Sequence, residues 1–219
     1  MRTSRWSSDT LRAHLHGRRV HLVVLVAVFE HELEDISALT YSRRRGLGGL
    51  ETERLAMRPV AMADVDQLVA LDSDPEVMRY LTGGKPSTRS EVEALVAQRL
   101  GSRWMAYERE TGGFVGWFGA RATDEDEHEL GYRLARRHWG RGLATEGTVE
   151  VIHEVFSARG AKRVWAQTMA VNTRSRRVIE RCGLKYVRTF HVSWDDPIEG
   201  TEQGEVEHEL LRRDWQARH

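Results

Sequence analysis

One stretch of the chain, residues 128–159, limits what it can fold into more than any other. Residues 128–135 alternate apolar and polar side chains, which is the pattern of a β-strand with one face in a core. A turn with Gly140 and Gly142 follows, and helical spacing then runs from about Leu143 to Arg159. The sequence therefore predicts a strand, a glycine turn and a helix in direct succession.

This strand–turn–helix junction has the features of an anion-binding site. The N–H groups of the turn and of the first helical turn have no partners within the helix and can bind an anion. Gly140 and Gly142 let the backbone come close to a ligand because they carry no side chain. Arg137 and Arg141 add positive charge. Together these residues predict a site for a diphosphate.

The spacing of the glycines excludes two common types of phosphate-binding turn. A phosphate-binding loop of the Gly-x4-Gly-Lys-Ser/Thr type needs a lysine, and residues 129–147 contain none. A dinucleotide-binding turn needs Gly-x-Gly-x-x-Gly, but here the third glycine comes only at Gly147. The pattern that remains is Arg-x-x-Gly-x-Gly, formed by Arg137, Gly140 and Gly142.

The rest of the chain alternates strand and helix patterns. Strands are predicted at 54–60, 103–110, 113–121, 163–169, 186–194 and 205–211. Helices are predicted at 63–71, 75–81, 88–100 and 172–183. Strands interleaved with helices in this order predict a mixed α/β sheet with helices on its faces.

The Arg-x-x-Gly-x-Gly turn resembles the pyrophosphate motif of the GNAT acyltransferases, which reads Gln/Arg-x-x-Gly-x-Gly/Ala. Its surroundings resemble the branch named for the ribosomal-protein acetyltransferases RimJ and RimL, including that branch's Asn-x-x-Ser helix. The segments that carry this resemblance are 51–59, 74–80, 131–132, 139–146, 172–184 and 205–215. The resemblance therefore covers residues 51–215, in the order of the family.

The resemblance implies the GNAT fold, an α/β domain with a splayed, mixed and mostly antiparallel sheet flanked by helices. We place this acetyltransferase domain at residues 51–219. Residues 1–50 are interpreted as a loosely ordered N-terminal extension that ends in a basic, glycine-rich linker. Acetyl-CoA is the implied co-substrate, bound in the V between the strands at 129–135 and 163–169.

The resemblance also assigns cofactor-binding residues. The diphosphate would meet the turn and the first helical turn, the pantetheine amides would pair with backbone near Leu134, and Asn172 and Ser175 would face the thiol. The complete set is Leu134, Arg136, Arg137, Gly140, Arg141, Gly142, Ala144, Thr145, Asn172 and Ser175.

Two catalytic residues are predicted, Glu129 and Ser175. Acyl transfer to an amine needs a neutral amine, and Glu129 lies on the predicted strand at the acceptor side, where the family has an acidic residue. The alternative for Glu129 is a strand-end glutamate in solvent. Family members often have a tyrosine that protonates the leaving thiolate, but Ile179 occupies that position here, which leaves Ser175 as the nearest hydroxyl. Leu184 in place of phenylalanine is a milder departure.

The composition excludes other kinds of partner. Lysines and arginines number 33, as do aspartates and glutamates, so no net charge favours nucleic acid. The longest apolar run, 22–29, is far shorter than the ~20 residues of a membrane span. The single cysteine, Cys182, is expected to be a buried packing residue of a cytoplasmic protein. The spacing His-Glu-x-x-His does not occur, so surface histidines and no metal are expected.

Three functions remain open at this stage. The first is acetylation of protein N-terminal amines, and the second is acetylation of a small amine such as a polyamine, an aminoglycoside or an amino acid. The third is a catalytically silent acyl-CoA-binding module, which the loss of the motif tyrosine keeps in consideration. The sequence is compatible with a monomer or a homodimer.

Overall fold

A computed structural model describes residues 48–194 and 196–218. The apolar run at 22–29 lies outside these residues, as do the predicted N-terminal extension and linker except for residues 48–50. The strands are β1 (Leu50–Glu51), β2 (Leu55–Pro59), β3 (Arg103–Glu108), β4 (Phe114–Asp124), β5 (Glu127–Leu134), β6 (Arg163–Met169), β7 (Lys185–Phe190) and β8 (Glu205–Leu211). The α-helices are α3 (Val65–Asp72), α4 (Pro75–Thr82), α5 (Arg89–Gln98), α6 (Leu143–Ala158), α7 (Thr173–Arg181) and α8 (Arg212–Gln216).

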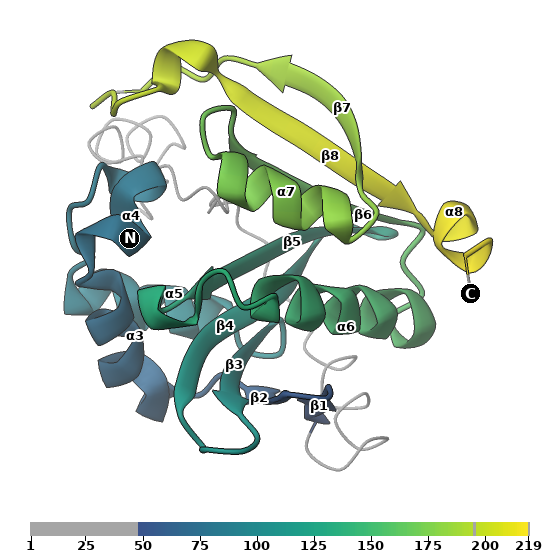
Figure 1. The fold of residues 1–219 in the computed structure, drawn as a ribbon, viewed down its shortest axis with the longest axis horizontal. Coiled ribbons are helices and arrows are strands. Elements are labelled where there is room, and N and C mark those ends of the chain that lie inside the picture. The colour runs from purple at the N-terminus through teal and green to yellow at the C-terminus, as the bar shows by residue number, and fades with distance from the viewer. Residues whose placement is uncertain (1–47, 195, 219) are drawn as a thin grey trace, which may run out of the picture.

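The strands form one sheet in the order β1-β2-β3-β4-β5-β6-β8-β7. Neighbouring strands are antiparallel except β5 and β6, which run parallel. The predicted mixed, mostly antiparallel sheet is therefore confirmed. The helices lie against the sheet, with α6 and α7 crossing in front of it and α3, α4 and α5 at one side (Figure 1).

Strands β5 and β6 pair only at one end. Glu127, His128 and Glu129 pair with residues 163–165. Beyond these residues β5 and β6 do not pair with each other. The two strands then diverge and leave an open V between residues 130–134 of β5 and residues 166–169 of β6 (Figure 1). Both arms keep their outer partners, because β5 pairs with β4 and β6 pairs with β8 along their lengths.

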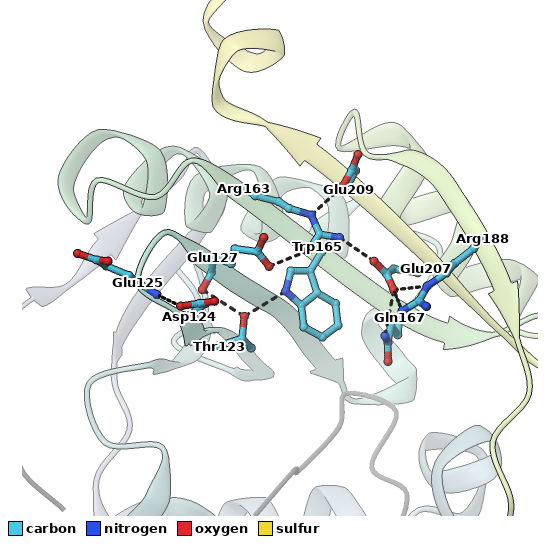
Figure 2. A network of polar contacts seen from close by, with 10 residues as sticks. All are labelled: Thr123, Asp124, Glu125, Glu127, Arg163, Trp165, Gln167, Arg188, Glu207 and Glu209. Atoms are coloured by element: carbon cyan, nitrogen blue, oxygen red, sulfur yellow. Dashed lines mark hydrogen bonds and ion pairs between the residues drawn. The ribbon is translucent and has the colours of Figure 1, made fainter. Parts of the chain in front are cut away.

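A charge network holds the closed end of this V together (Figure 2). Arg163, the first residue of β6, donates to Glu127 on β5 at 2.8 Å. The same guanidinium donates to Glu207 and Glu209 on β8 at 2.6 and 2.7 Å. One arginine side chain thus ties three strands together where β5 and β6 are still paired.

Two apolar clusters cover the two faces of the sheet. Helices α6 and α7 bury their inner faces against strands β2 to β6 and β8, through Leu143, Val151, Ile152, Val155, Phe156, Ile179 and Cys182. Helices α3, α4 and α5 cover the opposite face around Trp117 and Met105, through Val65, Leu68, Leu71, Val77, Val92 and Val96. No helix in the described ranges 48–194 and 196–218 has the length and apolar character needed to cross a membrane.

Gly147 explains how closely α6 approaches the sheet. A Cβ atom at this position would lie 2.4 Å from the ring of Phe118 on β4. Real side chains do not approach so closely, so the absence of a side chain lets the helix sit directly on the aromatic ring. This contact fixes the height of α6, and with it the glycine turn before the helix.

Two expected elements end differently in the structure, and one strand was not expected. Helix α5 stops at Gln98, and Gly101 follows with φ of +77°, so Leu100 lies outside the helix and is exposed rather than on its apolar face. Strand β7 ends at Phe190 because its partner there, Glu205, is the first residue of β8. Strand β1 was not predicted, and it begins at Leu50, at the end of the predicted extension.

The expectation that all histidines lie on the surface is wrong. His128, His138 and His208 are each less than a tenth exposed. Burial lowers the pKa of His128 to about 4, so this side chain is neutral near pH 7. His208 is buried because β8 lies between β6 and β7, an arrangement that no local pattern reveals.

Candidate active site

The predicted glycine turn forms at the mouth of the V. A 3-10 turn (Arg136–His138) follows β5, and Gly140 and Gly142 then take φ values of +73° and +82°. These left-handed values favour glycine, and Gly142 is the N-cap of α6. A Cβ atom added at Gly140 would meet nothing within 4 Å, so the backbone is open to solvent at this point.

The arginines of the turn are anchored to neighbouring strands. Arg137 Nη2 donates to the carbonyl of Phe114 on β4 at 2.7 Å. Arg141 Nη1 pairs with Glu108 Oε1 on β3 at 2.6 Å. Because both side chains reach back to the β3–β4 hairpin, the turn is held in place by the sheet as well as by α6.

A cavity of about 340 Å³ opens beside the start of this turn. Arg136 and Arg137 line it on one side, and Arg136 Nε lies 3.4 Å from Asp74 Oδ2. The other residues that line it are Gln67, Ala70, Leu71, Val77, Phe114 and Ala135. The cavity places an apolar wall from α3 and α4 against two of the predicted cofactor-binding arginines.

Glu146 fastens the first turn of α6, which contains Ala144 and Thr145, to the β1–β2 region. It accepts hydrogen bonds from the Thr52 hydroxyl at 2.5 Å, from the Arg54 N–H at 2.9 Å and from Arg54 Nε at 2.7 Å. Burial disfavours the charged carboxylate, but these hydrogen bonds outweigh it and lower the pKa of Glu146. The helix N-terminus is therefore fixed next to the V.

The open arm of β5 turns backbone groups toward the V. The Ala135 N–H donates to Val115 on β4, and backbone groups alternate sides along an antiparallel strand. The N–H and C=O groups of Tyr132 and Leu134 consequently point away from β4, toward the gap. The Leu134 carbonyl accepts a hydrogen bond from the Trp139 indole at 2.8 Å.

The first turn of α7 brings Asn172 and Ser175 to the same gap. The Asn172 side chain caps the helix by accepting the Ser175 N–H at 3.1 Å, which is the role that asparagine favours at an N-cap. Ser175 Oγ lies 3.0 Å from the hydroxyl of Tyr132 on β5. This contact bridges the V from one side to the other, and sequence reasoning missed it.

Tyr132 could have been found from the strand pattern. Side chains alternate along β5, so Tyr132 and Glu129 point to opposite faces of the sheet. Tyr132 points to the face that α6 and α7 cover. Burial raises the pKa of Tyr132, so its hydroxyl keeps its proton at neutral pH. Ile179, at the position of the family's usual tyrosine, is buried in the apolar core.

Glu129 is buried, with 2% of its surface exposed. It forms an ion pair with Arg121 on β4, whose Nε lies 3.1 Å from Glu129 Oε2. The alternative of a strand-end glutamate in solvent is therefore wrong. Glu129 shares the face of Arg133, which pairs with Asp72 of α3, so it lies on the side of the sheet away from Ser175.

Residues 54–185 match the family model described as an acetyltransferase (GNAT) domain. The chain belongs to the GNAT acetyltransferase family. The GNAT fold expected from the sequence is thereby confirmed.

Curated relatives include transacetylases and N-acetyltransferases. The FsC-acetyl coenzyme A-N(2)-transacetylase of Aspergillus fumigatus is 31% identical, over 76% of this chain and 77% of that protein. The uncharacterized N-acetyltransferase YoaA of Bacillus subtilis is 30% identical, over 62% of this chain and 82% of that protein. These relatives support N-acetyltransferase activity.

Solved structures share the fold at lower identity. A GNAT-family acetyltransferase from Bacillus anthracis has a TM-score of 0.64 and 21% identity, covering 75% of this chain and 99% of that one. The spermidine N-acetyltransferase from Vibrio cholerae has a TM-score of 0.62 and 17% identity, with the same coverage of 75% and 99%.

Cys182 of this GNAT protein is a packing residue, as predicted. It is buried at the end of α7, and its Sγ lies 3.7 Å from the carbonyl of Thr145 in α6. Burial raises the pKa of the thiol to about 12. The thiolate that a nucleophile needs is therefore not formed at neutral pH.

A second buried carboxyl was missed by sequence reasoning. Glu205 begins β8 opposite Met169, the last residue of β6 and the open end of the V. It is 2% exposed, and its Oε2 atom has no hydrogen-bond partner within the described part of the chain. Burial raises the pKa of Glu205 from 4.5 to about 7. Glu129, Glu205 and Glu207 are thus all buried on one sheet face, where Glu129 and Glu207 are ion-paired and Glu205 Oε2 has no hydrogen-bond partner among the described residues.

The raised pKa of Glu205 predicts a pH dependence of folding stability. The folded state holds this proton more tightly than the unfolded state, so its contribution is fully present below pH 4.5 and is lost as the pH rises through about 7. The variant Glu205→Gln should gain roughly 2–3 kcal/mol relative to the wild type between pH 5 and pH 8. Urea unfolding at both pH values measures the difference. If the difference in unfolding free energy between Glu205→Gln and the wild type is the same at pH 5 and pH 8, Glu205 ionises normally.

Proposed function

We propose that this GNAT protein transfers the acetyl group of acetyl-CoA to a primary amine by direct attack. The observation that carries the proposal is the V between β5 and β6, which opens directly onto a glycine turn and a helix N-terminus. The N-acetyltransferase relatives support it, as does the CoA bound in the related spermidine N-acetyltransferase fold.

The residues at the V suit the parts of acetyl-CoA. The diphosphate would meet the backbone from Arg137 to Thr145, where Gly140 is open and the helix N-terminus favours negative charge. Arg136 and Arg141 lie at the edges of this turn and add positive charge. The Leu134 N–H would pair with a pantetheine amide, or polarise the thioester carbonyl as it gains negative charge.

Glu129 is proposed as the general base and Ser175 as the hydroxyl that protonates the leaving thiolate. They lie on opposite faces of the sheet, as expected if the amine and the thioester approach the V from opposite sides. Tyr132 would position Ser175 through their 3.0 Å contact. The thiol formed has an ordinary pKa of about 8.5, so the thiolate can leave with only a hydrogen bond from Ser175, and any proton that Ser175 gives up would be replaced from solvent.

The first acceptor to test is a protein N-terminal α-amine, as in the RimJ/RimL branch. About a tenth of such an amine is neutral at pH 7, so it needs only a weak base. One solved structure with this fold, at TM-score 0.59 and 18% identity, is a putative ribosomal-protein-serine acetyltransferase from Vibrio cholerae. A small amine is the alternative acceptor. The protein would act in the cytoplasm, where its free thiol stays reduced.

A direct assay tests the proposed activity. The protein is mixed with acetyl-CoA and a panel of peptides, polyamines, aminoglycosides and amino acids, and released CoA is followed with a thiol reagent. Acetylation of one amine class supports the proposal. Tight acetyl-CoA binding with no acetylated product from any amine would favour the silent acyl-CoA-binding module instead.

The diphosphate assignment predicts a selective effect at Gly140. Gly140→Ala and Gly160→Ala change glycines with the same φ of +73° and the same open surroundings. Both should lose a similar ~1–2 kcal/mol of stability from left-handed strain. Only Gly140→Ala should weaken acetyl-CoA binding in calorimetric titration, because only Gly140 faces the diphosphate. Equal acetyl-CoA affinities in the two variants would show that the diphosphate does not bind at Gly140.

The base assignment predicts a pH-dependent loss of rate. Glu129→Gln should lower kcat/KM at pH 7 by roughly 10²–10⁴-fold and leave acetyl-CoA affinity unchanged. The defect should shrink as pH rises, because the amine then loses its proton unaided. Glu205→Gln is the matched control, as a buried acid on the same sheet face. Wild-type kinetics for Glu129→Gln together with a large loss for Glu205→Gln would transfer the base role to Glu205.

The acid assignment predicts a shared effect of two hydroxyls. Ser175→Ala should lower kcat by about tenfold with little change in acetyl-CoA affinity, which is the effect of losing one hydrogen bond to a charged group. Tyr132→Phe should lower kcat in the same direction, and the double variant should be no slower than Ser175→Ala alone. Stopped-flow CoA release measures each rate. Full activity in Ser175→Ala would assign thiolate protonation to water.

A further inference from the structure

A small cavity adjoins Glu129 on the face of the sheet that α3 and α5 cover. Its volume is about 20 Å³, room for roughly one water-sized group. The residues that line it are Arg99, Ser102, Arg103, Trp117, Gly119, Ala120, Arg121, Glu129 and Gly131. The proposed base therefore shares this cavity with three arginines.

The charges around the cavity do not balance. Glu129 pairs with Arg121, and the nearby Arg133 pairs with Asp72. Arg99 and Arg103 remain, and neither side chain makes a hydrogen bond or an ion pair with any residue in the described ranges 48–194 and 196–218. Among the described residues, two guanidinium groups at the cavity therefore have no ion-pair partner.

Arg103 is the more deeply placed of the two. Arg103 is 4% exposed, and its guanidinium lies 3.8 Å from the centre of the Trp117 ring. Burial, reinforced by the positive charges of Arg133 and Arg99, lowers the pKa of Arg103 to about 9. Asp72 offsets this effect only in part. A buried charge with no ion pair among the described residues is costly, so an anion that enters this cavity removes an existing penalty.

We propose that this arginine cavity is a subsite for a carboxylate carried by the amine acceptor. A guanidinium binds a planar carboxylate through its oxygens, and the cavity has room for one such oxygen beside Arg103. The inference rests on the proposed function, because it places the acceptor amine at Glu129 and the acceptor carboxylate at Arg103. The same charges disfavour polyamines, whose second ammonium would face Arg99 and Arg103.

Stacking on Trp117 is the competing role for Arg103. A cation over a tryptophan ring stabilises a fold with no ligand at all. Arg159 provides the matched control, because its guanidinium lies 4.8 Å from the ring centre of Trp104 and it does not line the cavity. Arg159→Met and Arg103→Met each remove one arginine–tryptophan contact, so effects confined to Arg103→Met report on the cavity.

The first experiment measures anion binding without enzyme activity. The melting temperature of the full chain is followed with increasing sodium acetate or neutral acetamide, with ionic strength held constant by sodium methanesulfonate. Acetate should raise the melting temperature of the wild type and of Arg159→Met, and acetamide should not. Arg103→Met should lose the acetate effect. No acetate effect in the wild type, or an equal one in Arg103→Met, overturns the inference.

The second experiment measures acceptor choice by CoA release. β-Alanine is compared with β-alaninamide and 1,3-diaminopropane, and peptides starting Ser-Asp are compared with peptides starting Ser-Asn. The acidic member of either set should have a kcat/KM about tenfold or more above its neutral match, and Arg103→Met should abolish the preference. A preference among the small amines would assign the carboxylate to a small-molecule acceptor, and a preference among the peptides would assign it to a peptide.

The two experiments separate this inference from the proposed function. If acetate binds through Arg103 but no amine is acetylated, the acetyltransferase proposal fails and the anion site stands. If an amine is acetylated with no preference for a carboxylate, or with a preference that survives in Arg103→Met, the carboxylate subsite is refuted and the acetyltransferase proposal stands.

Discussion

The short parallel pairing of β5 and β6 is the constraint on which the rest of this structure depends. After three paired residues the strands separate, and the backbone groups of Tyr132 and Leu134 face a gap instead of a neighbouring strand. Buried backbone groups need hydrogen-bond partners, so an open edge inside a sheet invites a ligand that supplies them. Arg163 holds the closed end by bonding to β5 and β8 at once, which lets the other end open without loss of the sheet.

The same opening separates the chemistry into two sides. Alternation along β5 sends Tyr132 toward α7, where it meets Ser175, and sends Glu129 toward α3 and α5. A donor of the acetyl group and an amine can therefore approach one strand from opposite faces. The glycine turn extends this arrangement, because it leads directly from β5 to the N-terminus of α6.

The two sides differ sharply in polarity. The α6–α7 side is an apolar core that raises the pKa values of Tyr132 and Cys182, so both groups stay protonated. The opposite side buries arginines and carboxylates within one sheet face. Burying charges costs free energy even when they are paired. Such a cost is reasonable where a face recognises a charged substrate, and Arg103, which has no ion pair among the described residues, is the clearest sign of it.

The sequence by itself determined the elements whose signals are local. Alternation gave β5, Asp74 and Thr88 capped α4 and α5, and Gly140 and Gly142 marked the turn that ends in a left-handed N-cap. The family resemblance, carried by the same motifs, gave the sheet. Only the tertiary structure decided the contacts between residues far apart in the chain. Examples are Tyr132 with Ser175 and Glu129 with Arg121 inside a buried layer. The burial of Glu205, whose Oε2 has no hydrogen-bond partner among the described residues, was likewise decided by the tertiary structure. Burial and charge pairing depend on which strands become neighbours, and no local pattern records that β6 pairs with β8 or that Arg99 and Arg103 line one cavity with Glu129.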